Sequence, residues 1–263
     1  MRESGELSAG DRPPPGWLIA DPEPYEEYDL GSLKTGKEAE VFLIERTASD
    51  GRSCILAHKR YRPRKVSTKG ELADLGFQRA NAFVNDHAYR NGRRFANSRD
   101  ERAAKTMTSY GRQLLSRSWP GRELEVMTRL WQAGVNVPFP VSQTTDGLLM
   151  QYIGDSSGAA PRLAQAQLDL EGAALAAAQL RSDLHRMVGA GLVHGDLSPY
   201  NLLWWQGRLW MIDLPQAVDI ALNLNALDLL LRDLRNVALW FQRRGVAFDA
   251  DDVFAELLSA AFG

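Results

Sequence analysis

Apolar and β-branched residues gather in short runs along the first part of the chain. Two such runs, residues 40–46 and 53–60, flank the tetrapeptide Ala48-Ser49-Asp50-Gly51. Its Asp-Gly pair is typical of a tight turn, so the sequence predicts an antiparallel hairpin. A third short strand is expected over residues 147–152, after a stretch at 135–141 whose prolines indicate a loop or a sheet edge.

Further along the chain, apolar residues recur at the spacing of helices with one buried face. Glycines follow several of these segments and indicate where the helices end. Residues 202–205 and 209–212 are interpreted as two short strands around a Gln206-Gly207 turn. The helices are expected over residues 123–131, over the alanine-rich stretch that ends at Gly189, over 227–241, and from Asp249 onward.

This order of elements predicts an α+β fold with a strand-rich N-terminal part and a mainly helical C-terminal part. We place the N-terminal part at residues 29–150 and the C-terminal part at 151–263, with a hinge near 150–154. Residues 1–28 are rich in proline, end in an acidic cluster and show no periodicity, which predicts a disordered tail.

The composition is that of a globular protein. The 263 residues suit one large domain or two lobes, and a hydrophobic content of 44% is enough for a real core. No apolar run approaches the roughly 20 residues that span a bilayer, and the N-terminus has no hydrophobic signal region, so we expect a cytoplasmic protein without membrane association. The single cysteine, Cys54, lies in an apolar run and is interpreted as a buried thiol.

Charge is distributed unevenly, although the formal net charge is only -2. From His58 to Arg122 there are sixteen Lys/Arg against five Asp/Glu, a local +11, so the rest of the chain carries -13. We therefore expect a basic inserted loop at about residues 62–112, whose cations could contact RNA phosphates. A solvated charged loop is the competing interpretation, because aromatic residues are sparse in it.

The stretch 31–45, GSLKTGKEAEVFLIE, partly matches the sequence pattern of a phosphate-binding P-loop but lacks a residue that the P-loop requires. Gly31, Gly36 and Lys37 fit the pattern, yet Glu38 stands where a P-loop needs a Ser or Thr hydroxyl for its magnesium ion. The glycines also precede an apparent strand, whereas a P-loop opens a helix. A turn that feeds a strand predicts a hairpin folded over a nucleotide.

The segment 192–216, LVHGDLSPYNLLWWQGRLWMIDLPQ, carries the sharpest chemical signal. His194-Gly195-Asp196, with Asn201 five positions later, fits the catalytic loop of protein kinases, and Asp213 ends an apolar strand twelve residues further on. We assign Asp196 as the catalytic base, and Asn201 and Asp213 as ligands of Mg²⁺, with Mn²⁺ as an alternative ion. An ordinary turn before a hairpin is the competing interpretation.

An ATP site of this kind needs a lysine from the strand-rich lobe. In residues 54–61, CILAHKRY, strand alternation puts Ala57 and Lys59 on one face, and the small Ala57 leaves room for adenine. Lys59 is therefore the predicted phosphate lysine, against the alternative of a surface lysine at a strand end. A glutamate should orient this lysine, and both Glu123 and Glu125 lie at the start of the predicted helix. The apolar positions of the helix do not settle which of the two faces Lys59.

Three features together resemble the RIO family of atypical protein kinases: the T-G-K-E-A loop at residues 35–39, Lys59, and HGDLSPYN followed by IDLPQ. In that family the T-G-K-E-A loop replaces the usual glycine triplet. The resemblance covers roughly residues 29–245 and points to a bacterial-type branch without an N-terminal winged helix. It implies a two-lobed kinase-like fold, ATP as cofactor, and autophosphorylation.

The resemblance also implies roles for individual residues. Thr35 and Lys37 would border the nucleotide, and Glu123 would pair with the phosphate lysine. Gln151 and Ile153 would bind adenine through backbone groups. The family is often poised as an ATPase that passes phosphate through the metal-binding aspartate, and its roles in ribosome assembly make ribosomal particles a candidate partner of the basic loop.

Two features distinguish the chain from ordinary protein kinases. Only about ten residues separate Asp213 from the helix expected near Leu224, and they contain no A-P-E segment, so an activation loop would not fit. Gly195 replaces the arginine of H-R-D, which normally pairs with a phosphorylated activation loop. With no such loop, no such arginine is needed.

Two other functions compete with a Ser/Thr kinase or ATPase. Small-molecule phosphotransferases of the aminoglycoside or choline kinase type share H-G-D-x-x-x-x-N, but the T-G-K-E-A loop and the lack of a sizeable insertion after Asp213 argue against them. A nonenzymatic nucleotide-binding scaffold is disfavoured because Lys59, Asp196, Asn201 and Asp213 are all present.

Overall fold

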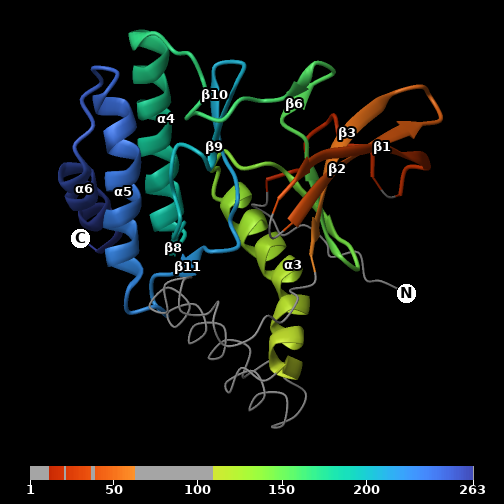
Figure 1. Cartoon of the computed structure of the whole chain (residues 1–263), viewed down its shortest axis with the longest axis horizontal. Coiled ribbons are helices and arrows are strands. Elements are labelled where there is room, and N and C mark those ends of the chain that lie inside the picture. Colours follow the sequence, from red (N-terminus) through yellow and green to blue (C-terminus); the bar gives the residue numbers. More distant parts are fainter. Residues whose placement is uncertain (1–11, 21, 37–38, 63–108, 263) are drawn as a thin grey trace.

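The computed structural model of the protein describes residues 12–20, 22–36, 39–62 and 109–262. Figure 1 shows twisted strands on one side and a group of helices on the other, with the long helix α3 (Ser109–Gln132) between them. This is the two-lobed α+β arrangement that the sequence predicts. None of the helices within the described residues has the length and apolar character needed to cross a membrane.

The strand-rich lobe is one antiparallel sheet in the order β1-β2-β3-β5-β4. The predicted hairpin is confirmed as β2 and β3, which pair Thr47 with Ser53 around a turn where Gly51 has φ +86°. The predicted third strand is β5, and the proline-containing stretch before it supplies the edge strand β4. The strands are β1 (Tyr25–Thr35), β2 (Ala39–Ala48), β3 (Ser53–Tyr61), β4 (Pro140–Gln143) and β5 (Gly147–Gln151).

The prediction of a disordered tail through residue 28 is wrong for the residues described there. Strand β1 begins at Tyr25, and Ile19 is 1% exposed within a small core formed with the sheet. The Arg46 guanidinium donates to the Ile19 carbonyl at 3.1 Å. The prolines and acidic residues of this segment made its short apolar run, residues 17–19, easy to overlook in the sequence. In the fold, Leu18 and Ile19 of this run pack against the sheet.

Helix α3 also begins earlier than the predicted residue 123, at Ser109. Residues 109–122 contain Pro120-Gly121, a pair that normally indicates a break, and this is why the pattern alone placed the start later. Most of the basic loop expected at about 62–112 falls on residues 63–108, outside the described residues.

The C-terminal lobe holds three helices where the sequence predicts them: α4 (Leu170–Gly189), α5 (Ala226–Gln242) and α6 (Ala250–Phe262). The predicted hairpin is confirmed as β9 and β10, and both Gln206 and Gly207 have positive φ, as a tight hairpin turn requires. The short strands are β6 (Gly154–Asp155), β7 (Gly158–Ala159), β8 (Leu192–Val193), β9 (Leu202–Trp205), β10 (Arg208–Met211) and β11 (Val218–Asp219).

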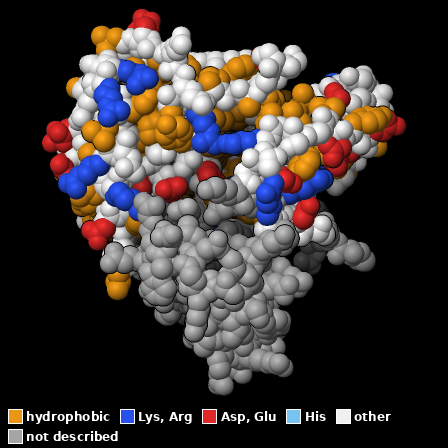
Figure 2. All heavy atoms as spheres, viewed as in Figure 1, with side chains coloured by type: hydrophobic (Ala, Val, Ile, Leu, Met, Phe, Trp, Pro, Cys, Tyr) orange, Lys and Arg blue, Asp and Glu red, His pale blue; other side chains and the backbone are white. Residues whose placement is uncertain are grey.

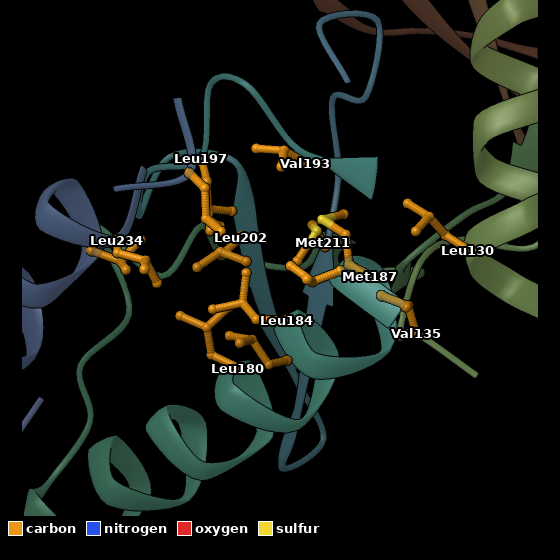
Figure 3. Close-up of a cluster of buried hydrophobic side chains, with 14 of the residues drawn as sticks. Leu130, Val135, Leu180, Leu184, Met187, Val193, Leu197, Leu202, Met211 and Leu234 are labelled. Carbon is orange, nitrogen blue, oxygen red and sulfur yellow. The ribbon is translucent and has the colours of Figure 1, made fainter. Parts of the chain in front are cut away.

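The main hydrophobic core holds the β9–β10 hairpin on helix α4 (Figure 3). Leu180, Leu184 and Met187 of α4 are at most 1% exposed. They lie beside Leu202 and Met211 of the hairpin, which are equally buried. Full burial of each such side chain stabilises the fold by about 1.5–3 kcal/mol. The loop between β8 and β9 and the segment after β10 therefore start from firmly held positions.

Candidate active site

Lys59 lies on β3, the central strand of the sheet, between Val41 of β2 and Leu148 of β5. Its largely buried ammonium donates hydrogen bonds to Glu123 Oε1 at 2.8 Å and to Asp213 Oδ1 at 3.0 Å. One nitrogen thus connects the sheet, helix α3 and the segment after β10. Lys59 is a buried cation held by two carboxylates, not a surface lysine.

The position of Lys59 depends on a glycine in the neighbouring strand. A Cβ atom at Gly147 would lie 1.8 Å from the Lys59 carbonyl oxygen and 2.8 Å from its carbonyl carbon. No side chain fits at these separations, so only glycine allows β5 to approach β3 this closely.

Helix α3 determines which glutamate faces the lysine. Glu123 is 2% exposed and forms the 2.8 Å ion pair, whereas Glu125 is exposed. Residues two positions apart on a helix point roughly 200° apart, so only one of them can reach Lys59. The choice that the apolar pattern left open is Glu123.

The charges of this pair follow from burial and proximity. Burial lowers the pKa of Lys59, but Glu123 and Asp213 more than offset this effect, so the pKa is raised and Lys59 stays protonated. Burial also raises the pKa of the Glu123 carboxyl, and the Lys59 ammonium opposes that rise. The pair is therefore stable only while both members are present.

Two arginines tie helix α3 to the segment that follows β10. The Arg122 guanidinium donates to the Ala217 carbonyl at 2.6 Å, and Arg129 pairs with Asp219 at 3.2 Å. Arg122 directly precedes Glu123 in the sequence. The glutamate is therefore positioned by contacts with the helical lobe as well as by its lysine.

Asp213 follows β10 in the left-handed backbone region, with φ +66°. This conformation is uncommon for a residue other than glycine and is frequent at functional sites. Burial raises the pKa of the Asp213 carboxyl, but the Lys59 ammonium more than offsets this, so its pKa is lowered. The side chain is 53% exposed. Asp213 therefore presents an ionised carboxylate that is open to a ligand.

The predicted catalytic loop lies between β8 and β9. The Asn201 side-chain nitrogen donates to the Asp196 carbonyl at 2.8 Å, which leaves the Asn201 amide oxygen for a ligand. The His194 ring donates through Nε2 to the Ile212 carbonyl at 3.1 Å, and its Nδ1 accepts from the Asp196 N–H at 3.3 Å. His194 thus connects the backbone at Asp196 to the residue before Asp213.

Sequence reasoning missed a buried carboxylate that holds this loop. Asp233 of α5 is 1% exposed and accepts the Gly195 N–H at 2.8 Å, while the neighbouring Arg232 donates to the Gly195 carbonyl. Burial raises the pKa of Asp233, and nearby positive charges oppose that rise. The signal was present in the sequence, because an aspartate between Leu230 and Leu234 interrupts the apolar face of a helix.

Gly195 is required at its position for a steric reason. Its φ is +80°, and a Cβ atom there would lie 2.4 Å from the Gln216 carbonyl oxygen. The arginine of the usual H-R-D sequence would not fit this backbone. Between Asp213 and the start of α5 at Ala226 the chain forms only β11 and turns, so it has no activation loop, as predicted.

The connection between the lobes follows β5. The Gln151 N–H donates to the Phe139 carbonyl at 2.8 Å, and the Ile153 carbonyl accepts from the Ala160 N–H at 2.9 Å. An adenine contact at these two residues would therefore use the Gln151 carbonyl or the Ile153 N–H.

The turn between β1 and β2 contains two further predicted residues. Thr35 ends β1 and pairs with Glu40, and the turn is closed by the Gly36 N–H, which donates to the Ala39 carbonyl at 2.9 Å. Thr35 is exposed in this arrangement. Lys37 lies outside the described residues.

A sheet lobe that presents a lysine–glutamate pair to a catalytic loop on a helical lobe is the arrangement of protein kinases, and the fold is of that class. The RIO domain family matches residues 82–253 of the chain. The chain belongs to the RIO family, as its T-G-K-E-A and HGDLSPYN motifs indicate.

The relatives carry the names of serine/threonine kinases. A probable serine/threonine-protein kinase RIO1 homolog of Encephalitozoon cuniculi is 33% identical over 230 residues, which cover 86% of this chain and 57% of that protein. The RIO-type serine/threonine-protein kinase Rio1 of Haloferax volcanii is 39% identical over 138 residues, or 52% of this chain and 47% of that protein. Serine/threonine-protein kinase RIO3 of Mus musculus is 28% identical over 242 residues, which cover 89% of this chain and 42% of that protein. The chain spans about half the length of these relatives.

Proposed function

We propose that the protein is an ATP- and metal-dependent RIO-type serine/threonine kinase or ATPase. The observation that carries this proposal is the Lys59 nitrogen, which lies 2.8 Å from Glu123 and 3.0 Å from Asp213. The names of the relatives support serine/threonine kinase chemistry. The short connection after Asp213 gives no support to a small-molecule phosphotransferase, because it holds no acceptor-binding insertion.

The donor atoms fit a hard divalent cation, Mg²⁺ or Mn²⁺. Asp213 offers a half-exposed carboxylate, and Asn201 offers its amide oxygen. Across the described part of the chain, no group of three or more His, Cys, Asp or Glu side chains could hold an ion. This suits an ion held by two side chains together with phosphate oxygens. Such an ion, held by Asp213 and Asn201, would supply positive charge that offsets the charge of the phosphates.

The protein's own side chains would bind the phosphates, accept the proton and, in an ATPase cycle, accept the phosphoryl group. Lys59 binds phosphate oxygens, and Glu123 keeps its ammonium in place. Asp196 accepts the proton of an acceptor hydroxyl. In an ATPase cycle, Asp213 would itself accept the phosphoryl group, since its lowered pKa keeps the carboxylate ionised and its side chain is half exposed.

Adenine would be bound by the Gln151 carbonyl and the Ile153 N–H, and the phosphates would be covered by the turn that holds Thr35 and Lys37. A partner for the basic stretch, RNA or a ribosomal particle, is proposed from its local charge of +11 alone. A cytoplasmic location is part of the same proposal, because ATP is abundant there.

The test is incubation with γ-labelled ATP and Mg²⁺. Asp196→Asn and Asp213→Asn are compared with the wild type and with Asp228→Asn, an exposed aspartate of α5 that serves as the matched control. We expect transfer to fall on the order of 10²-fold or more in the first two variants and to be unchanged in the control. Acid-stable label would indicate phosphoserine or phosphothreonine, and hydroxylamine-labile label would indicate an acyl phosphate on Asp213. Absence of ATP turnover by the wild type, or equal activity in all variants, would refute the proposal.

A further inference from the structure

An arginine outside the predicted site lies against the catalytic loop. Arg162 forms an isolated antiparallel bridge with Leu203 of β9. The N–H groups of residues 163 and 164 donate to the carbonyls of Leu202 and Pro199 at 2.8 and 2.9 Å. These backbone contacts hold Arg162 beside the loop that contains the candidate base and the metal-binding amide.

Arg162 is half-buried, and its guanidinium forms no hydrogen bond or ion pair with any residue that the structure describes. Arg129, by contrast, is paired with Asp219 at 3.2 Å. Partly removing a cation from water without a counter-ion is unfavourable, so a half-buried arginine of this kind fits a site that an anion completes.

The charge of Arg162 is not isolated from the site. Its positive charge interacts electrostatically with the Asp213 carboxylate. The pKa of Lys34, on β1, is lowered by partial burial and then by Arg162, while Asp213 opposes both effects. Figure 2 shows Lys and Arg side chains between the strand-rich and the helical parts. The Asp213 carboxylate therefore interacts electrostatically with cations from both lobes, Lys34 and Arg162.

We propose that Arg162 binds the terminal phosphate of ATP. This inference rests on the proposed function and adds a residue to it. A guanidinium can donate two parallel hydrogen bonds to phosphate oxygens and is always charged, which suits it to this role.

Phosphoryl transfer from ATP breaks one phosphorus–oxygen bond and forms another. The bond between the terminal phosphorus and the oxygen that bridges to the β-phosphate breaks, and its electron pair leaves with ADP. The acceptor hydroxyl oxygen bonds to the phosphorus, and its proton passes to Asp196. Arg162 stabilises the negative charge on the equatorial oxygens of the phosphoryl group during this passage.

The experiment separates a phosphate contact from a structural role by comparing two nucleotides. Binding of a nonhydrolysable ATP analogue and of ADP, each with Mg²⁺, is measured by calorimetry on the full chain. Arg162→Gln should bind the analogue roughly 10-fold to 100-fold more weakly and ADP within about twofold of the wild type. Arg208→Gln is the matched control, because Arg208 is exposed on the adjacent hairpin, and should leave both affinities unchanged.

The single-turnover rate of phosphate release from ATP should fall on the order of 10²-fold in Arg162→Gln. Arg162→Lys keeps a cation without the planar fork and should recover part of the loss; it also serves as the test if Arg162→Gln fails to fold. Equal weakening of the analogue and ADP, or no weakening of either, would overturn the role of Arg162 while the proposed function stood. If the wild type bound neither nucleotide, the proposed function would fail first and this inference with it.

Discussion

Replacing Lys59 by methionine tests the buried ion pair directly. Methionine keeps an unbranched side chain but removes the ammonium 2.8 Å from Glu123. Glu123 is 2% exposed, so its carboxylate would be left buried without its counter-ion. Breaking a buried pair by removing one partner costs about 3–5 kcal/mol. Since domains are commonly stable by about 5–15 kcal/mol, the variant should be folded but strongly destabilised at neutral pH.

The size of this loss should depend on pH, in a direction set by Glu123. Burial already raises the pKa of its carboxyl, and without Lys59 nothing comparable opposes that rise. A group whose pKa is higher in the folded state supports folding below its unfolded pKa, and this support is lost as pH rises through the folded pKa. Lys59→Met should therefore be closest to the wild type near about pH 5 and least stable near about pH 8.

The measurement is urea unfolding followed by tryptophan fluorescence at both pH values. The double variant Lys59→Met/Glu123→Gln should regain much of the loss at the higher pH, because no buried charge remains. Arg208→Met removes an exposed cation on the β9–β10 hairpin and should stay within about 0.5 kcal/mol of the wild type. A loss that is the same at both pH values, or a double variant no more stable than Lys59→Met at the higher pH, would refute the reasoning.

Variants at other positions test individual contacts of the site. Gly147→Ala should destabilise the protein by more than about 2 kcal/mol in denaturant titration, because the new Cβ would overlap the neighbouring strand; a variant as stable as the wild type would contradict the steric argument. Asp233→Asn should lower phosphotransfer about 10-fold with ATP affinity nearly unchanged, because the carboxylate that fixes the Gly195 N–H loses its charge; a loss of affinity alone would argue against a loop-positioning role. Glu123→Gln should lower phosphotransfer strongly, whereas Glu125→Gln should leave it within about twofold, and the reverse order would show that the wrong glutamate has been identified.

Much of the fold could be predicted because it depends on local signals. The β2–β3 hairpin is specified by two apolar runs around Asp50-Gly51, and the β9–β10 hairpin by two runs around Gln206-Gly207. The loop that contains Asp196 and Asn201 was recognisable because its chemistry requires fixed residue types at short spacing.

The features that the sequence did not reveal depend on contacts between distant segments. Ile19 is buried only because strands that begin after it offer an apolar surface. Asp233 acts on a loop 38 residues away. Arg162 takes its place from backbone bonds to β9 and the preceding loop. The apolar pattern could not separate Glu123 from Glu125, and only the family resemblance pointed to Glu123, because the direction of helix α3 relative to the sheet depends on distant contacts.

The attachment of α3 through Arg122 and Arg129 bears on how such a protein could be controlled. Swinging this helix away from the sheet would break both contacts with the other lobe. In many protein kinases that swing is the switch, and the lysine–glutamate pair forms only after activation. Here the pair is assembled without any modification of the chain. Control would then have to act on access of ligands to the site, so that in the resting protein the site would be empty or blocked while the ion pair stays formed.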